Sequence, residues 1–394
     1  MNIKDYQKRV WAEIDLHAVE TNYNLIKKHL NIDTQICCVI KANAYGHGAV
    51  EMAKFYSKLG VEYFAVSNVE EALQLRREGI DAEILVLGYT NPKCSKILAD
   101  NNVIQCVYSL EYAKLLSTQA QKDNVKVKTH IKIDTGMGRI GFRCVNNKEN
   151  ELDQALCACQ LQNLLVEGVF THFAVADEGE KGRVYTNKQI ENFNFAINFL
   201  ENKGVKFKLK HCSNSGAICD YSHVNMDMVR AGIVLYGLQP SCDIINKYQL
   251  KPVMTLKTVV SHVKKINIGD SVNYGRAFIA EKQMTVATLP IGYADGLWRG
   301  NSGKIKLTIN GTKVDILGRI CMDQLVVDVS CIEDIKIGDE VVVFGAEPYT
   351  TAQEIATINN TISYEVVCAI GYRVPRIYVY NGQALSVNDN LLKQ

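Results

Sequence analysis

Short apolar runs alternate with amphipathic stretches along the first 240 residues. Eight of these runs are almost continuously apolar, as expected of strands that are buried on both faces. They are Ile36–Ile40, Tyr63–Asn68, Ile84–Tyr89, Ile104–Ser109, Thr129–Asp134, Glu167–Phe173, Leu209–Ser213 and Met228–Tyr236. Eight strands alternating with helices over this length predict an N-terminal (β/α)8 TIM-type barrel. A doubly wound open sheet is the alternative, which we disfavour because the strand count reaches eight.

Two sequence signatures predict where helices begin between these strands. Ser67 with Glu70 matches a capping box, in which the first side chain binds a backbone N–H and the second binds back. Thr186 with Gln189 matches a second capping box, and Gly204 is expected to end the helix that follows. Both signatures lie between predicted strands, as a barrel requires.

The pattern changes after Pro240, where the chain becomes rich in Val, Ile and Thr with closely spaced turn signals. Asn310-Gly311 and Asn381-Gly382 each lie between two strand-like runs, and this dipeptide is the strongest short-range signal of a β-hairpin. One helical stretch, residues 350–358, interrupts the strands. The second part of the chain is therefore predicted to be a mostly antiparallel β domain.

The chain has 394 residues, which is too long for one ordinary domain. We predict a barrel over residues 13–246 and a β domain over residues 247–394, with residues 1–12 packing with the β domain. No Pro-rich or Ser-rich linker separates the two parts in the sequence, so we expect the domains to pack closely.

Composition narrows the possible partners and the cellular location. The net charge is +2 and like charges form no block, which argues against nucleic acid or an anionic membrane as a partner. The first residues contain no apolar signal segment, and no run approaches the roughly 20 apolar residues of a membrane span. The thirteen cysteines are odd in number and include no C-x-x-C pair, so we expect reduced thiols in a cytoplasmic protein.

Candidate reactive residues follow the predicted strands, at the end of a barrel where active sites lie. Lys41 follows the first run, and it is either a strand-end lysine that reaches water or a desolvated amine able to form a Schiff base. His172 and His211 follow neighbouring strands, which suggests one shared site. They could also be metal ligands, but no third ligand at a fixed spacing supports a metal. We therefore predict no metal.

Other residues at these strand ends suggest a phosphate site. Barrels commonly bind phosphate with the loops after strands seven and eight, where Ser215 and Gly232 lie, and Arg230 is on strand eight. A G-x-G-x-x-G match at residues 136–141 is weak evidence for NAD, because four strand-helix units precede it. A lysine, a phosphate cradle and an arginine suggest a phosphate-bearing aldehyde cofactor. A Schiff-base aldolase with a phosphorylated substrate would also fit these residues.

Nine motifs in a fixed order resemble the alanine racemase family over nearly the full length. They are VIKANAYGHG at Val39–Gly48, DTGMGR at Asp134–Arg139, THF at Thr171–Phe173, HCSNS at His211–Ser215, RAGIVLYG at Arg230–Gly237, YGR at Tyr274–Arg276, GYADG at Gly292–Gly296, GRICMDQ at Gly318–Gln324 and YRVPR at Tyr372–Arg376. The family places a barrel that binds pyridoxal 5′-phosphate (PLP) before a β domain, in agreement with the order predicted above.

The resemblance implies a role for each matching residue that binds the cofactor. Lys41 resembles the lysine that holds PLP. Arg230 resembles the arginine that faces the pyridine nitrogen, Arg139 the arginine beside the phenolic oxygen, and His172 the histidine under the ring. The residues that match the phosphate binders of the family are Tyr45, Ser215, Gly232, Ile233 and Tyr372.

The resemblance also implies residues that act on the substrate. Tyr274 resembles the second catalytic base, opposite Lys41. Tyr293 and Met322 resemble residues at the substrate entrance and carboxylate site, together with Arg139. Lys132 resembles a lysine that some members carry as a carbamate.

The implied activity is the interconversion of L-alanine and D-alanine by two bases, in a head-to-tail homodimer whose β domains complete the partner's site. In a bacterium this activity would supply D-alanine for the cell wall. A serine-preferring racemase of the family is the nearest alternative, but such relatives have an asparagine at the position of Tyr372 and carry membrane domains. A PLP-dependent decarboxylase and a non-catalytic PLP-binding protein are more distant alternatives.

Overall fold

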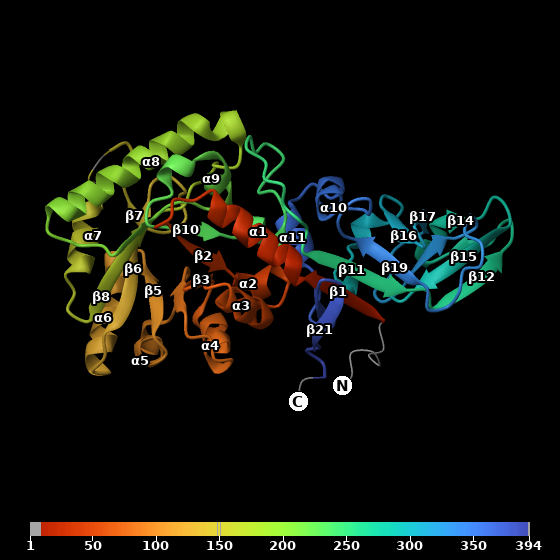
Figure 1. Cartoon of the computed structure of the whole chain (residues 1–394), viewed down its shortest axis with the longest axis horizontal. Helices are drawn as coiled ribbons and strands as arrows, with labels where there is room; N and C mark the ends of the chain where they lie inside the picture. The colour runs from red at the N-terminus through yellow and green to blue at the C-terminus, as the bar shows by residue number, and fades with distance from the viewer. Residues whose placement is uncertain (1–8, 148, 150, 393–394) are drawn as a thin grey trace.

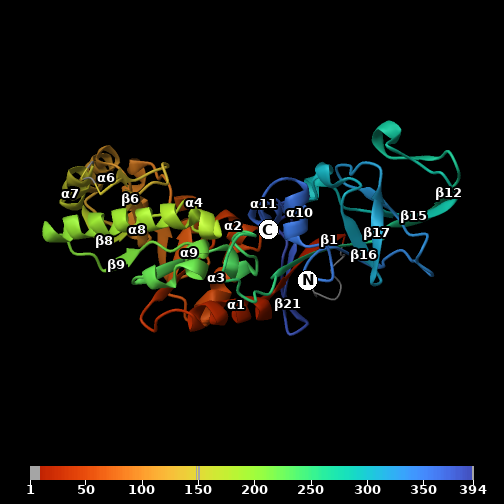
Figure 2. The same cartoon turned by 90° about the horizontal axis from the view of Figure 1, so that it is seen from above.

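The computed structural model describes residues 9–147, 149 and 151–392. Two bodies lie side by side along the long axis of the molecule (Figures 1 and 2). The N-terminal half forms a barrel surrounded by helices, and the C-terminal half forms a body made mainly of strands. Within the described ranges, no helix is long and apolar enough to cross a membrane.

Eight parallel strands form the barrel in the part of the chain that the structure describes. They are β2 (Gln35–Val39), β3 (Tyr63–Val66), β4 (Glu83–Val86), β5 (Val103–Val107), β6 (Val127–Asp134), β8 (Leu164–Phe170), β9 (Leu209–His211) and β10 (Met228–Ala231). Each overlaps one predicted run, so the barrel prediction is confirmed. Backbone bonds from Asp227 N to Lys210 O (3.2 Å) and from Arg230 N to Ser213 O (2.9 Å) close the barrel between β9 and β10.

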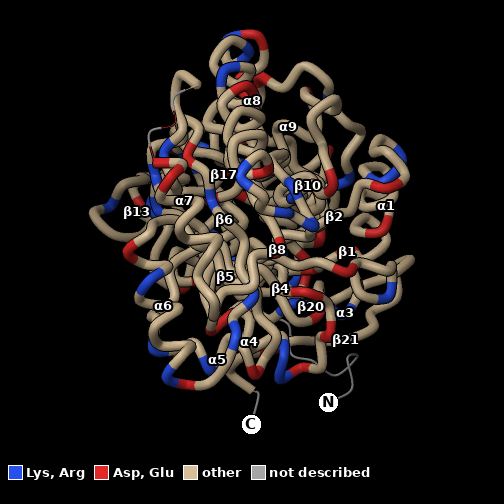
Figure 3. The backbone as a smooth tube through the Cα atoms, turned by 90° about the vertical axis from the view of Figure 1, so that its left-hand side faces the viewer, with Lys and Arg blue, Asp and Glu red and all other residues tan. Residues whose placement is uncertain are grey.

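The strands are apolar because they are covered on both sides, by the barrel interior and by helices. In β5, for example, all five residues are buried. The surrounding helices are α1 (Leu16–Lys28), α3 (Ala49–Lys58), α4 (Val69–Arg77), α5 (Ser95–Asp100), α6 (Leu110–Lys122), α7 (Leu152–Cys159), α8 (Gly179–Asn202) and α9 (Ser215–Asp220). Figure 3 shows that acidic and basic residues are interspersed along the backbone at the barrel end of the molecule.

Both predicted capping boxes are wrong. The N-cap of α4 is Asn68, whose side chain accepts a hydrogen bond from Glu71 N, so the cap lies one residue after Ser67. Helix α8 begins at Gly179, which puts Thr186 inside the helix, where its side chain is buried. In the sequence alone, this buried threonine has the spacing to Gln189 that is typical of a helix N-cap. The predicted end of α8 is correct, because Gly204 follows it with a φ of 88°.

The C-terminal body contains a ten-stranded sheet, and every neighbouring pair is antiparallel except β1 with β20. In spatial order its strands are β12 (His262–Ile266), β15 (Met284–Leu289), β18 (Leu325–Asp328), β17 (Thr312–Leu317), β16 (Lys306–Ile309), β19 (Glu340–Phe344), β11 (Met254–Val259), β1 (Val10–Asp15), β20 (Arg376–Tyr380) and β21 (Gln383–Asn388). The predicted antiparallel character is confirmed. Strand β1 comes from the N-terminus, and residues 1–8 of the segment predicted to pack here lie outside the described residues.

Both predicted hairpins are present, β16–β17 at Asn310-Gly311 and β20–β21 at Asn381-Gly382. Both asparagines and both glycines have positive φ angles, as a two-residue type I′ hairpin turn requires. The predicted helix at 350–358 is α10 (Ala352–Ile358), which is followed by α11 (Ser363–Cys368). A short pair, β13 (Ser271–Val272) with β14 (Phe278–Ile279), lies at the outer end of this body (Figure 1).

The β domain contacts the barrel where the first barrel strand ends. Gly46 packs so closely on α11 that a Cβ atom there would lie 2.2 Å from the carbonyl oxygen of Val367. Arg376 of β20 is buried and donates to the carbonyl oxygens of Gly46 (2.9 Å) and Ile370 (2.8 Å). The β domain therefore fixes one edge of the barrel mouth. The boundary between residues 246 and 247 stays a prediction.

Candidate active site

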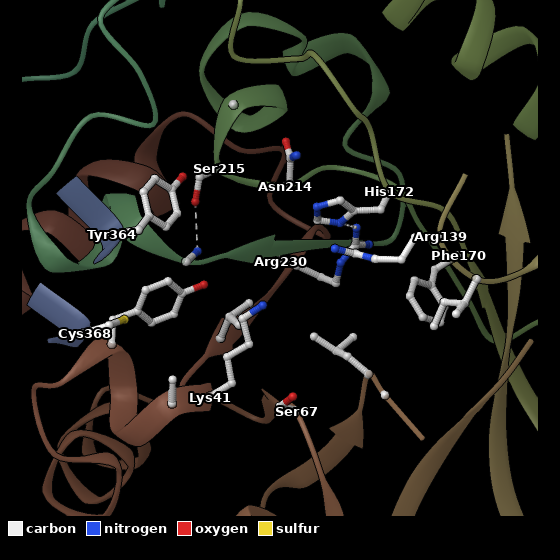
Figure 4. A pocket seen from close by; sticks show the side chains of 18 of the residues that line it. Lys41, Ser67, Arg139, Phe170, His172, Asn214, Ser215, Arg230, Tyr364 and Cys368 are labelled. Carbon is white, nitrogen blue, oxygen red and sulfur yellow. Dashed lines mark hydrogen bonds between the residues drawn. The ribbon is translucent and has the colours of Figure 1, made fainter. Parts of the chain in front are cut away.

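A cavity of about 680 Å³ opens at the carboxyl ends of the barrel strands. Lys41 projects into its middle, with Ser215 and Tyr364 on one side and Arg139 and His172 on the other (Figure 4). Most of the lining comes from the barrel, and α11 of the β domain contributes Tyr364. Lys41 thus points into a cavity at the end of the barrel where the sequence predicts the chemistry.

Lys41 follows the buried strand β2 and begins an unusual turn. The next four residues, 42–45, all have φ angles between 51° and 53°, which is the left-handed region. This turn is labelled α2 (Lys41–Tyr45) and ends at Gly46. Burial, with the nearby positive charge of Arg139, lowers the pKa of the Lys41 amine. The half-buried Lys41 with its lowered pKa favours the second of the two interpretations that the sequence left open, a partly desolvated amine.

Tyr45, Ser215 and Gly232 form a small polar cradle beside Lys41. The Gly232 N–H donates to Ser215 Oγ at 3.0 Å, as the dashed line in Figure 4 indicates. A Cβ atom on Gly232 would lie 2.8 Å from the hydroxyl oxygen of Tyr45, so a larger residue would fill the cradle. The next residue, Ile233, is buried and begins a 3-10 turn. The hydroxyl groups of Tyr45 and Ser215 can form hydrogen bonds with the oxygens of a phosphate group, and the missing side chain of Gly232 leaves room for it.

Arg230 lies at the opposite side of the cavity and is only 3% exposed. Its guanidinium donates to Nδ1 of His211 at 2.9 Å and to Nδ1 of His172 at 3.2 Å. It also donates to the carbonyl oxygens of Thr171 (2.8 Å) and Cys212 (3.0 Å). Burial lowers the pKa of Arg230 to about 10, so the group remains cationic at neutral pH. These hydrogen-bond partners are neutral groups, which leaves its charge available to a ligand.

The contacts of Arg230 determine the tautomers of the buried histidines. A guanidinium only donates, so His172 and His211 must each accept at Nδ1 and carry their proton on Nε2. His211 then donates from Nε2 to Nδ1 of His130, at 2.9 Å. Gly168 makes room for His130, because a Cβ atom there would lie 2.7 Å from the imidazole ring. Burial lowers the pKa of all three histidines, that of His130 to about 3, so they stay neutral.

Four basic side chains therefore face one cavity, Lys41, Lys132, Arg139 and Arg230, against two carboxylates, Asp177 and Glu365. Lys132 is buried, donates to the carbonyl oxygen of Ile133 at 2.9 Å, and has a pKa lowered to about 8 by burial. This excess of positive charge, next to a phosphate-sized cradle, fits an anionic ligand that carries a phosphate group.

Five predicted site residues do not line this cavity within the described chain. Ile233 is buried beside Gly232. Tyr274, Tyr293 and Met322 lie on the β domain and are 72%, 41% and 52% exposed. Tyr372 is 69% exposed, and its hydroxyl donates to the carbonyl oxygen of Asn390 at 3.0 Å. The predicted roles of these five residues, like those of the residues that line the cavity, stay predictions.

Sequence reasoning missed several residues that line the cavity or support it. Phe170 ends β8, and its position just before His172 was the available signal. Tyr364 and Cys368 come from α11, and no pattern in the sequence indicated that this helix reaches the barrel mouth. Glu71 binds the backbone directly after Lys41, a contact between segments that are 29 residues apart.

Comparisons with known proteins agree with this geometry. Residues 14–240 match the model "Alanine racemase, N-terminal domain" and residues 253–378 match "Alanine racemase, C-terminal domain". The chain belongs to the alanine racemase family. The alanine racemase of Clostridium perfringens strain SM101 is 46% identical over 384 residues, covering 96% of this chain and 98% of that one.

Solved structures of relatives superimpose on nearly the whole chain. The alanine racemase of Clostridium difficile 630 has 43% identity and a TM-score of 0.92, covering 98% of this chain and 99% of the other. The Bacillus anthracis alanine racemase with bound L-Ala-P has 36% identity and a TM-score of 0.92, covering 98% and 99%. The family uses PLP, and the cavity fits this cofactor, since it combines a desolvated lysine, a cradle that a Cβ atom would fill, and excess positive charge.

The neutral histidines predict how stability depends on pH. Below the ordinary histidine pKa of about 6.5, the unfolded chain gains protons that folded His130 does not bind until about pH 3. Each such histidine should lower the free energy of unfolding by about 1.4 kcal/mol per pH unit as the pH falls from 6 to 4.5. The free energy of unfolding, measured with urea, should therefore depend less steeply on pH in His130→Gln than in the wild type, by about this amount.

The control for this measurement is His262→Gln, which changes an exposed histidine on β12. The free energy of unfolding of this variant should depend on pH as steeply as that of the wild type. An equal slope for wild type and His130→Gln would contradict the conclusion that His130 is buried in its neutral form.

Proposed function

We propose that the chain interconverts L-alanine and D-alanine, with Lys41 as the base on one face of the substrate and Tyr274 as the base on the other. The observation that carries this proposal is the desolvated Lys41 amine in one cavity with a phosphate-sized cradle and the buried Arg230. The membership of the family, at 46% identity to a relative named alanine racemase, supports it.

Racemisation requires removal of the α-proton from one face of an amino acid and its return to the other. When bound, PLP supplies the electron sink that makes this weakly acidic proton removable. Lys41 holds the cofactor and, once released by the substrate amine, takes or returns the proton on its face. The lowered pKa of Lys41 favours this role, because a general base works best when its pKa lies near the operating pH.

The remaining cavity residues hold and orient the cofactor and substrate. Tyr45, Ser215, Gly232, Ile233 and Tyr372 would bind the phosphate of the cofactor. The cationic Arg230 would face the pyridine nitrogen, where an always-charged group would disfavour protonation of the ring. Arg139 would bind the phenolic oxygen of the cofactor and the substrate carboxylate.

Tyr274 needs help to act as a base, because a phenol ionises near pH 10. Since His172 accepts from Arg230 at Nδ1, its Nε2 carries a proton that it can donate to a phenolate. Hydrogen bonding to the charged form of a group favours that form. The same tautomer that satisfies Arg230 therefore suits His172 to support Tyr274.

The second base comes from a partner subunit in this proposal. Tyr274 is 72% exposed and lies between β13 and β14, and β14 is at the end of the β domain far from α2 (Figure 1). A head-to-tail homodimer brings the Tyr274, Tyr293 and Met322 of one subunit to the cavity of the other. The exposure of all three side chains, two of them aromatic and the third large and apolar, is typical of an interface that the single chain leaves uncovered.

Lys132 is proposed to carry a carbamate that binds Arg139. Only an uncharged amine reacts with carbon dioxide, and the pKa of about 8 leaves a substantial fraction of Lys132 uncharged at neutral pH. A carbamate would also reduce the excess of positive charge in the cavity.

A cytoplasmic location is part of the same proposal. All thirteen cysteines of the chain lie among the described residues, and none of them forms a disulfide bond there. Cysteines in this number without a disulfide bond are typical of proteins kept in a reducing compartment.

The alternatives within the same fold predict different products. Purified protein should convert L-alanine to D-alanine faster than it converts L-serine, in a chiral assay with added PLP. Borohydride, which fixes PLP to its lysine, should abolish both conversions. Faster conversion of serine would contradict the substrate assignment, and loss of carbon dioxide without racemisation would favour a decarboxylase.

The shared site predicts complementation between two inactive variants. Lys41→Ala and Tyr274→Ala subunits should each be inactive alone. After subunit exchange, half of the dimers are mixed and one of their two sites is intact, so activity should recover to about a quarter of the wild-type value.

The matched control mixes Lys41→Ala with the double variant Lys41→Ala, Tyr274→Ala, which leaves no intact site. Recovery in the control, or none in the first mixture despite dimers in sedimentation, would contradict the trans assignment of Tyr274.

A further inference from the structure

The carboxylate of Glu71 bridges the loops that follow two neighbouring barrel strands. Glu71 lies in the first turn of α4. Its Oε1 accepts a hydrogen bond from the backbone N–H of Ala42 at 2.7 Å, and its Oε2 accepts one from the backbone N–H of Ser67, also at 2.7 Å. Ala42 directly follows Lys41, and Ser67 directly follows β3. One side chain therefore ties the backbone of Lys41 to the adjacent strand.

The backbone held by Glu71 is in a conformation that most residues avoid. The run of positive φ angles starts at Ala42, with a φ of 51°, and continues to Tyr45. Such angles are disfavoured for residues with a Cβ atom, and they persist where surrounding contacts impose them. Inside the turn, Ala44 N donates to Ile40 O at 2.9 Å. The Glu71 carboxylate supplies the contact from outside, at the residue where the run begins.

Glu71 also places a negative charge near the Lys41 amine. The titratable groups that line the cavity or act on Lys41 are Glu71 on α4, Tyr89 after β4, Arg139 after β6, Lys132 on β6, His172 and Asp177 after β8, Arg230 on β10, Tyr45 on α2, and Tyr364, Glu365 and Cys368 on α11. Burial and Arg139 lower the pKa of Lys41, and Glu71 opposes them by raising it. Of the three carboxylates in this set, Glu71 is the one that accepts a hydrogen bond from the backbone next to Lys41.

We propose that Glu71 is a positioning residue for Lys41, because its two hydrogen bonds fix the left-handed turn that directs the amine into the cavity. The inference rests on the proposed function, in which Lys41 binds PLP. A glutamine at position 71 has one acceptor oxygen instead of two, so it can keep only one of the two backbone bonds, and it removes the charge. An aspartate keeps the charge but is one methylene shorter.

The test compares full-length Glu71→Gln, Glu71→Asp and the control Glu70→Gln. Glu70 is exposed and lies in the same helical turn, so its substitution removes the same charge from the first turn of α4. Two quantities are measured on each protein. One is the dissociation constant for PLP, from absorbance titration. The other is the pH dependence of Lys41 acetylation in the PLP-free chain, followed by mass spectrometry of the Lys41 peptide.

Glu71→Gln should bind PLP about tenfold more weakly, because one charge-assisted hydrogen bond is lost. The midpoint of Lys41 acetylation should move to lower pH, because loss of a nearby negative charge favours the neutral amine. Lys41 would then react more readily with the probe while it binds PLP less well. Glu71→Asp should weaken PLP binding, but its midpoint of Lys41 acetylation should stay near that of the wild type. Glu70→Gln should change neither quantity.

Two outcomes would overturn the inference. One is a Glu71→Gln variant that matches Glu70→Gln in both measurements. The other is a midpoint that moves to higher pH, since this reports hydration of Lys41 in a loosened fold and not the loss of a partner charge. If wild-type Lys41 is acetylated equally with and without PLP, the proposed function itself fails, and that result is distinguishable because it needs no variant.

Discussion

The burial of the Arg230 guanidinium among neutral partners is the constraint on which the rest of the site depends. A buried cation without a carboxylate is costly unless hydrogen bonds satisfy it. Here the carbonyl groups of Thr171 and Cys212 and the Nδ1 atoms of His172 and His211 accept its protons. These bonds tie the ends of β8, β9 and β10 together. The charge that they leave uncompensated makes the cavity a site for an anion.

The same arrangement fixes the chemistry of the neighbouring imidazoles. Because Arg230 occupies Nδ1 of each histidine, the protons lie on Nε2, and burial keeps the rings neutral. His211 in turn donates from Nε2 to Nδ1 of His130, and Gly168 leaves space for the His130 ring. On the other side of the cavity, Lys41 is held by a strained turn and by contacts to α4 and α11. The site is thus rigid on both sides of the space where the cofactor belongs.

Much of the fold was predictable because it depends on local patterns. The eight apolar runs became the eight barrel strands, and both Asn-Gly dipeptides formed hairpins, since burial on two faces and a positive φ each leave a clear local signature. Helix starts were less predictable. Thr186 looks like a cap in sequence, yet tertiary packing buries it inside α8.

The candidate site likewise contains some residues that the sequence predicts and others that it does not. Lys41, Ser215 and Arg230 were recognisable because each stands at a strand end, where a barrel collects its reactive groups. Tyr364 and Glu71 were not, because their roles come from contacts between segments that are distant in sequence. Tyr274 was recognisable only by resemblance, and in the single chain its side chain is exposed to solvent.

In the proposed function, this cavity holds PLP on Lys41. The measurement that tests this assignment is borohydride reduction of the PLP-loaded protein, followed by proteolysis and mass spectrometry of the lysine peptides. We predict the added mass of reduced PLP on the peptide that contains Lys41, at about one group per chain. Its presence on Lys132 or another lysine, or its absence from all of them, would contradict the assignment of Lys41.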